Sequence, residues 1–214
     1  MDSKGDTIGE KGIGFKSVFK VARQVKVQSE PFCFQFFYDG QKGLQMVTPY
    51  NAEFEPDLPS SVQTRITLLW QDENDFPKRL RELKDLPNTL LLFLRQIRRI
   101  TISIAGDSSG QVPGETLIYA YEHDDARSLG TLKKSCALKG SRGAPSNTIE
   151  STTRFFIKKR TIEDLPADES RMKRTQADVV LAFPKTDGEE PQLEVQHTYA
   201  YLPMRKFGFN VMCS

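Results

Sequence analysis

Three glycines near the start of the chain have the spacing of a loop that could hold a phosphate group. Gly9, Gly12 and Gly14 are followed by apolar residues at helical spacing, namely Phe15, Val18, Phe19 and Ala22. Glycine tolerates positive φ and lets a backbone approach a ligand closely. A helix that begins directly afterwards offers unpaired N–H groups and the positive end of its dipole. Together these features predict an anion site suited to phosphate.

The spacing excludes the two common phosphate-binding motifs. The order here is G-x-x-G-x-G-F-K-S, whereas the P-loop requires G-x-x-x-x-G-K-[ST]. The dinucleotide fingerprint, G-x-G-x-x-G after a strand, has its glycines in the reverse order. A glycine-rich turn that caps a surface helix remains the simpler alternative to a phosphate site.

Residues 7–21, which read TIGEKGIGFKSVFKV, resemble the second glycine box of the GHKL ATPases. This superfamily includes gyrase, the ninety-kilodalton heat-shock chaperone, histidine kinases and MutL, and the wording is most similar to the sacsin and NO VEIN type. The resemblance implies a loop that closes over the β- and γ-phosphates of ATP. It implies that Gly9 belongs to this loop and that four backbone N–H groups face phosphate, those of Gly12, Ile13, Gly14 and Phe15. We also expect the Lys11 side chain to reach the phosphates.

A second resemblance lies in a strand expected over residues 64–70. It reads Q-T-R-I-T-L where the family's last box has G-T-x-[IFV]-x-L, so that Gln63 replaces the glycine. The resemblance implies that the Thr64 hydroxyl touches the carboxylate and water network near adenine. Threonine is also an ordinary strand former, and this second interpretation of Thr64 stays open.

The resemblance further implies that catalytic groups lie upstream of the lid box. In the family, a helix supplies a glutamate that activates water and an asparagine that holds Mg²⁺, and a D-x-G-x-G aspartate binds adenine. Only eight residues precede Gly9, and residues 198–209 resemble a family segment that continues further. We therefore expect a fragment, truncated at both ends and inactive alone, of a parent that binds ATP with Mg²⁺. Whether that parent is an ATPase stays open.

Composition sets limits on the partners of the chain. Its 214 residues are 38% hydrophobic and 27% charged, with a net charge of +2, which argues against nucleic acid or an anionic membrane as partner. A basic run at residues 158–160 follows Phe155 and Phe156, but a solvated strand edge is the favoured interpretation. The expected partners are ATP or ADP, with protein clients or self-association as further options.

No catalytic or metal-binding set is predicted from the remaining polar residues. His123 and His197 lack partners at metal-ligand spacing. The three cysteines are scattered and indicate free thiols in a reducing interior, cytoplasmic or nuclear. The sequence shows no secretory signal and no apolar run long enough to span a bilayer.

Hydrophobic periodicity predicts helices followed by many short strands, an α+β protein of two parts. The resemblance implies that residues 1–71 are a partial GHKL domain, the C-terminal half of a Bergerat-type α/β sandwich with a mainly antiparallel sheet and few helices. Residues 72–214 would be a strand-rich middle segment, incomplete at its C-terminus. Helices are expected at residues 15–22, 76–83 and 90–97, and strands at 24–29, 32–38, 44–48, 64–70, 98–104, 116–121, 131–138, 153–159, 177–183 and 193–202.

The leading functional expectation is a fragment of an ATP-binding, chaperone-like GHKL ATPase. The alternative is a non-catalytic interaction or scaffold module that keeps the fold as a pseudo-ATPase. In either case the missing half of the sandwich would leave apolar side chains exposed on the sheet, most of all on the strand expected at residues 32–38.

Overall fold

The structure is a computed structural model, and it divides into two compact units. These are Met1–Arg81 and Glu82–Ser214. The residues that the structure describes are 13–38, 48–55, 61–72, 75–87, 89–94, 96–106, 114–139, 148–166, 175–186, 190–192, 194–200, 202–206, 208 and 211–213. The protein is mainly β with a few short helices, as the sequence predicts. The expected domain boundary after residue 71 stays a prediction.

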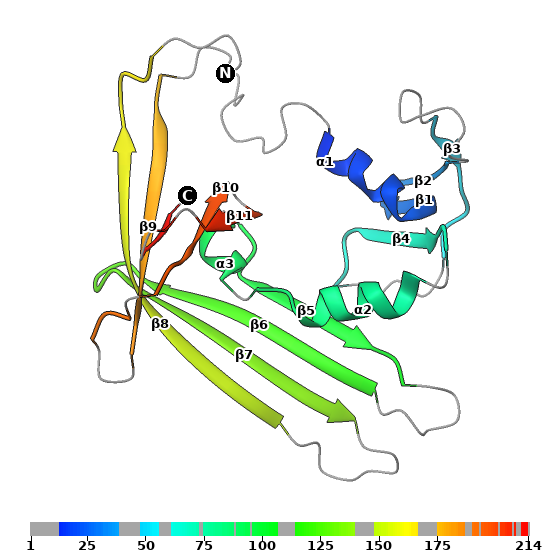
Figure 1. The fold of residues 1–214 in the computed structure, drawn as a ribbon. Coiled ribbons are helices and arrows are strands. Elements are labelled where there is room, and N and C mark those ends of the chain that lie inside the picture. Colours follow the sequence, from blue (N-terminus) through cyan, green and yellow to red (C-terminus); the bar gives the residue numbers. More distant parts are fainter. Residues whose placement is uncertain are drawn as a thin grey trace. The chain divides into compact units, whose positions relative to one another are not determined.

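The first unit carries a short helical segment and a four-stranded antiparallel sheet within its described residues (Figure 1). The segment consists of α1 (Ile13–Lys16) and the 3₁₀ helix η1 (Ser17–Lys20). The sheet has the order β3-β2-β1-β4. Its strands are β1 (Ala22–Ser29), β2 (Phe32–Phe37), β3 (Tyr50–Asn51) and β4 (Arg65–Trp70).

Period-two alternation gives this sheet one apolar face and one mixed face, on which Gln24, Lys26 and Gln28 of β1 lie with Phe37 and Leu69 of the neighbouring strands. On the apolar face, Val25 lies opposite Phe36 on one neighbouring strand and Leu68 on the other. Since side chains alternate along a strand, this face also carries Val27, Phe34 and Ile66. Phe19 of η1 packs with Ala22 and Val25 into the small core of the unit.

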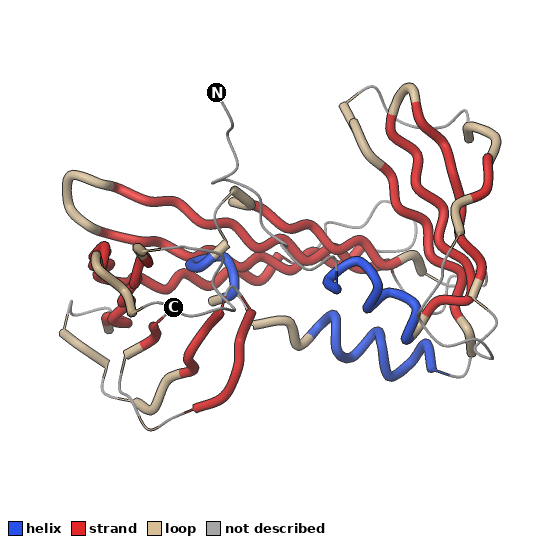
Figure 2. Tube along the Cα trace, turned by 90° about the horizontal axis from the view of Figure 1, so that it is seen from above, coloured by secondary structure: helices blue, strands red, loops and turns tan. Residues whose placement is uncertain are grey.

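The second unit begins within α2 (Phe76–Lys84) and continues through α3 (Leu90–Phe93) into a curled sheet (Figure 2). In the described residues the sheet order is β11-β10-β12-β9-β8-β7-β6-β5, and each neighbouring pair is antiparallel except β10 with β12. The strands are β5 (Arg99–Ile104), β6 (Gly114–Asp124), β7 (Leu129–Lys139), β8 (Thr148–Ile162), β9 (Ala177–Lys185), β10 (His197–Ala200), β11 (Leu202–Lys206) and β12 (Met212–Cys213).

The core of this unit lies between α3 and one face of the sheet. All four residues of α3 are buried, and Leu91, Leu92 and Phe93 join the sheet's buried side chains. Phe93 stacks on Tyr199 with ring centroids 4.3 Å apart, and the Tyr199 hydroxyl is hydrogen-bonded to Thr89. Four apolar residues in a row can all be buried in so short a helix because the sheet curls around it.

Four expectations about the elements need correction or fall outside the description. The strand expected at residues 193–202 is shorter, because β10 begins at His197, and Leu202 is the first residue of the next strand, β11. The helix expected through Ala22 ends earlier, because Ala22 pairs with Trp70 as the first residue of β1. The helix expected over residues 90–97 ends at Phe93, because Leu94 takes an extended backbone conformation. The strand expected at residues 44–48 lies almost wholly outside the described residues.

Candidate nucleotide-binding site

The predicted site residues fall partly within the described residues. Gly9, Lys11 and Gly12 lie outside them. Ile13 is the first residue of α1, followed by Gly14 and Phe15 in the same turn. Thr64 directly precedes β4.

Gly14 lies at an open position. A Cβ atom built on Gly14 would meet no atom within 4 Å, and its backbone lies outside the positive-φ region. Its carbonyl accepts a hydrogen bond from Ser17 Oγ at 2.7 Å. Neither packing nor backbone strain therefore requires glycine here.

Phe15 anchors the start of the helical segment to the sheet. Its ring makes edge contacts with Phe19 at 6.3 Å and with Phe36 at 5.8 Å between centroids, and the side chain stays 40% exposed. The side chain thus packs on β2, and the resemblance concerns only its backbone N–H.

The ring contacts also fix the direction of the helical segment over the sheet. Phe19 contacts Tyr38 and Phe36, whereas Phe15 contacts Phe36. Since β2 runs from Phe32 towards Tyr38, the helical segment runs in the same direction as β2. Its N-terminal end is therefore directed towards the start of β2, near Phe34.

Thr64 lies at the end of the sheet towards which the N-terminal end of α1 is directed. Its Oγ1 is 3.0 Å from Ser29 Oγ, in a hydroxyl pair that joins the start of β4 to the end of β1. Phe32 pairs with Ser29 from the other side. By strand alternation the hydroxyl pair shares a face with Val27 and Ile66, the face that η1 covers near Ala22.

That face is open around Thr64. Ile66 is 52% exposed and Phe32 is 65% exposed, whereas Phe19 and Val25 are buried under the helical segment. Of the apolar residues of β2 on this face, Phe32 is exposed, whereas Phe34 and Phe36 are half-buried, so the expected exposure holds for one end of the strand and occurs also at Ile66 of β4. The N-terminal end of α1 is therefore directed towards the region around the Thr64 hydroxyl, and this region is open and partly apolar.

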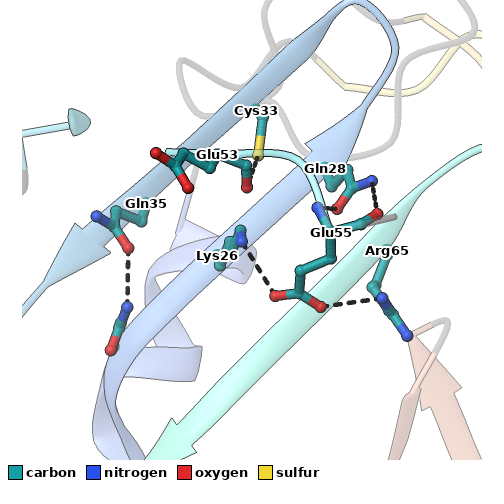
Figure 3. A network of polar contacts seen from close by, with 8 residues as sticks. Lys26, Gln28, Cys33, Gln35, Glu53, Glu55 and Arg65 are labelled. Carbon is teal, nitrogen blue, oxygen red and sulfur yellow. Dashed lines mark hydrogen bonds and ion pairs between the residues drawn. The ribbon is translucent and has the colours of Figure 1, made fainter. Parts of the chain in front are cut away.

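The opposite face of the same sheet holds a polar network that the sequence did not indicate (Figure 3). Glu55 accepts hydrogen bonds from Lys26 Nζ and Arg65 Nη1, each at 3.0 Å. The hydrogen bond from Lys26, followed by the charge of Lys26 and then by that of Arg65, lowers the pKa of the Glu55 carboxyl, whereas burial opposes this shift. The sequence holds one local indication of this polar network, which is the alternation of the polar residues Gln24, Lys26 and Gln28 along β1.

Other polar features of the described residues lie in the second unit. A hollow of about 420 Å³ is lined by Arg160, Thr161, Ile162 and Glu163. His123 is hydrogen-bonded to Tyr121 and paired with Asp125, while the buried Nδ1 of His197 lacks a partner in the described part of the chain. Among the described residues no group of three His, Cys, Asp or Glu side chains could hold a metal ion.

Comparison with known proteins adds no relative. No family model matches the chain, no curated protein matches it, and no solved structure matches it. Within the described residues, no helix has the length and apolar character needed to cross a membrane.

Proposed function

We propose that residues 9–20 form the phosphate lid of a GHKL-type nucleotide site in a chaperone-like ATPase of the sacsin and NO VEIN type. The observation that carries the proposal is the direction of α1 and η1 along the apolar face. Their N-terminal end, with Gly14, is directed towards the open region that contains Thr64. The order of loop, helix and antiparallel sheet agrees with the C-terminal half of a Bergerat-type sandwich.

The chemistry of this region suits a nucleotide. Unpaired N–H groups at the start of a helix favour the negative charge of phosphate, and Lys11 adds a positive charge to the same loop. The exposed apolar side chain of Ile66 lies beside the hydroxyl pair of Thr64 and Ser29. A purine base needs both kinds of contact, an apolar surface for its ring and hydrogen-bonding groups for its edge. In a complete domain, the upstream glutamate would act as the general base that activates water. The asparagine would hold Mg²⁺, and the aspartate would bind adenine.

Calorimetry with ATP and ADP in the presence of Mg²⁺ tests this proposal. It should use the 214-residue chain and, where the gene encodes upstream E-x-x-x-N and D-x-G-x-G segments, the chain that includes them. We expect the longer chain to bind and Lys11→Gln to weaken its binding. Lys20→Gln, at the other end of the helical segment, is the matched control. Failure of both chains to bind nucleotide would contradict the proposal.

The second candidate is a scaffold module that uses the same sheet for protein contacts. The observation that favours it is the exposure of Phe32 and Ile66 on one face, since exposed apolar side chains that adjoin one another often mark interaction sites. A gene without the upstream motifs, together with self-association that Ile66→Ser reduces, would support this candidate over nucleotide binding.

A further inference from the structure

The outer face of β8, opposite to the core of the second unit, carries a line of exposed basic and aromatic side chains. Phe155 and Ile157 point into the core and are buried. Because side chains alternate, the intervening residues Arg154, Phe156, Lys158 and Arg160 lie on the opposite face, and all four are exposed. We call these four residues the β8 stripe.

Register with β9 sets an apolar row beside the stripe. Phe156 lies opposite Phe183, Lys158 opposite Leu181, and Arg160 opposite Val179. The rings of Phe156 and Phe183 are tilted with centroids 6.3 Å apart, and Phe156 stays 43% exposed. The stripe therefore presents an accessible aromatic ring between positive charges.

The charges of the stripe are not neutralised within the described residues. No acidic partner of Arg154, Lys158 or Arg160 occurs there, whereas Lys159 on the core side is paired with Asp178 at 2.9 Å. On the same outer face of the neighbouring strands Lys133 pairs with Glu122 at 2.6 Å, and Arg127, in the turn between β6 and β7, pairs with Asp124. The basic run at residues 158–160 is thus divided between two faces, and the uncompensated charge belongs to the stripe.

We propose that the β8 stripe binds the backbone of a single-stranded nucleic acid, with a base stacked on Phe156. Successive side chains of the stripe lie about 6.6 Å apart along an extended strand. Along this line Arg154 lies about 13 Å from Lys158, with Phe156 between them, and Lys158 lies about 6.6 Å from Arg160. A row of cations on one strand face fits a linear polyanion, and a base has a flat face that the exposed ring can stack on. An acidic peptide would make no comparable use of Phe156. The sequence argued against nucleic acid because the total charge is near neutral and because a solvated strand edge was the favoured interpretation of residues 158–160; the structure adds that Arg154, Lys158 and Arg160 lie on one face with Phe156.

This surface lies in the second unit, so its test is independent of the proposed nucleotide lid. Fluorescence anisotropy with labelled twelve-residue oligo(dT) and oligo(U) would measure binding to the 214-residue chain at several salt concentrations. Neutralising three phosphates predicts a slope of log K against log salt of about −2. Lys158→Gln and Arg160→Gln should each reduce the size of the slope by about 0.7, as expected for the loss of one phosphate contact.

Matched controls separate the stripe from general charge. Lys159→Gln removes the same charge from the opposite face and should leave affinity within twofold. Phe156→Ala should weaken oligonucleotide binding by about five- to 150-fold, the range for loss of one base–aromatic stack. Ile149→Ala, which removes another exposed apolar side chain of β8, should have no such effect.

Competitors identify the class of partner. Polyaspartate of the same length and phosphatidylserine vesicles should bind at least tenfold more weakly than the oligonucleotides, and Phe156→Ala should not change their binding. The proposal is overturned if the chain does not bind oligonucleotide at low salt, if Lys159→Gln weakens binding as much as Lys158→Gln, or if polyaspartate or vesicles bind as well as the oligonucleotides.

Discussion

The Gln28 side chain forms two hydrogen bonds with the backbone of Glu55. Its Nε2 donates to the Glu55 carbonyl at 3.1 Å, and its Oε1 accepts from the Glu55 N–H at 3.1 Å. Gln28 is 4% exposed, and among the described residues it alone is polar or charged and buried. A primary amide thus serves as the missing strand partner for a segment that lies outside the sheet, and it holds Glu55 where Lys26 and Arg65 can reach it.

Substituting Gln28 with Leu should destabilise the first unit. The apolar side chain would remove two hydrogen bonds and leave the part-buried N–H and C=O of Glu55 without their partners, at a cost of about 1 kcal/mol or more. Gln24→Leu is the matched control, since within the described residues the Gln24 side chain is hydrogen-bonded to Gln35 and not to a backbone group. Urea unfolding followed by tryptophan fluorescence reports on this unit, because Trp70 in β4 is the one tryptophan of the sequence. Equal destabilisation by the two variants would contradict the role given to Gln28.

The stability of the first unit should fall in acid because of Glu55. The pKa of this carboxyl is lowered from its ordinary value of 4.5, first by the hydrogen bond from Lys26 and then by the charges of Lys26 and Arg65. The Glu55 carboxyl therefore binds a proton more readily in the unfolded chain than in the folded one. Its contribution to the stability of the first unit is present above about pH 4.5 and is lost as pH falls through the lower pKa of the folded state. Glu55→Gln should flatten this part of the pH profile of Trp70 unfolding, while Glu53→Gln should leave it unchanged.

The strands were predictable from the sequence to the extent that their burial alternates. In β1, Val25 and Val27 face the helical segment while Lys26 faces Glu55, so period-two alternation located the strand. The end of the helical segment was not predictable, because Ala22 fits both the helical spacing from Phe15 and the alternation of β1. Long-range pairing with Trp70 decides between these two patterns, and no local pattern contains that information.

The candidate site was predictable only through resemblance to a family. Glycine spacing indicated a phosphate loop, but the open region near Thr64 depends on which part of the sheet η1 covers. The polar network required a contact between Lys26 and Glu55, which are 29 residues apart. The β8 stripe was visible as a basic run, yet its charge imbalance depends on the pairing of Lys159 with Asp178 on the other face.

Gly14→Ala should separate a structural role of this glycine from a ligand-binding role. Because a Cβ at Gly14 meets no atom within 4 Å and φ is not positive, alanine should stabilise the first unit by about 0.5–1 kcal/mol. The same methyl group would obstruct close approach of phosphate, so nucleotide binding by a chain with a complete site should weaken. Urea unfolding and calorimetry on the same variant measure the two effects. A stabilised variant with unchanged nucleotide affinity would remove Gly14 from the proposed lid.

Gly130→Ala should destabilise the second unit, because this glycine, unlike Gly14, lies where its neighbours leave no room. An added Cβ would lie 3.0 Å from Tyr121 Cε2 and 3.1 Å from Ile157 Cγ1, two buried side chains of the core. Forcing a methyl group into a packed core costs about 1–3 kcal/mol. Amide hydrogen exchange should show faster exchange across β6, β7 and β8 in this variant, while Ser135→Ala, on the outer face of β7, should leave the rates unchanged. Trp70 fluorescence should report unaltered unfolding of the first unit, since the substitution lies in the other compact unit. Unchanged exchange across β6 to β8 would mean that the core yields around Gly130 and that its tight packing does not limit the stability of the sheet.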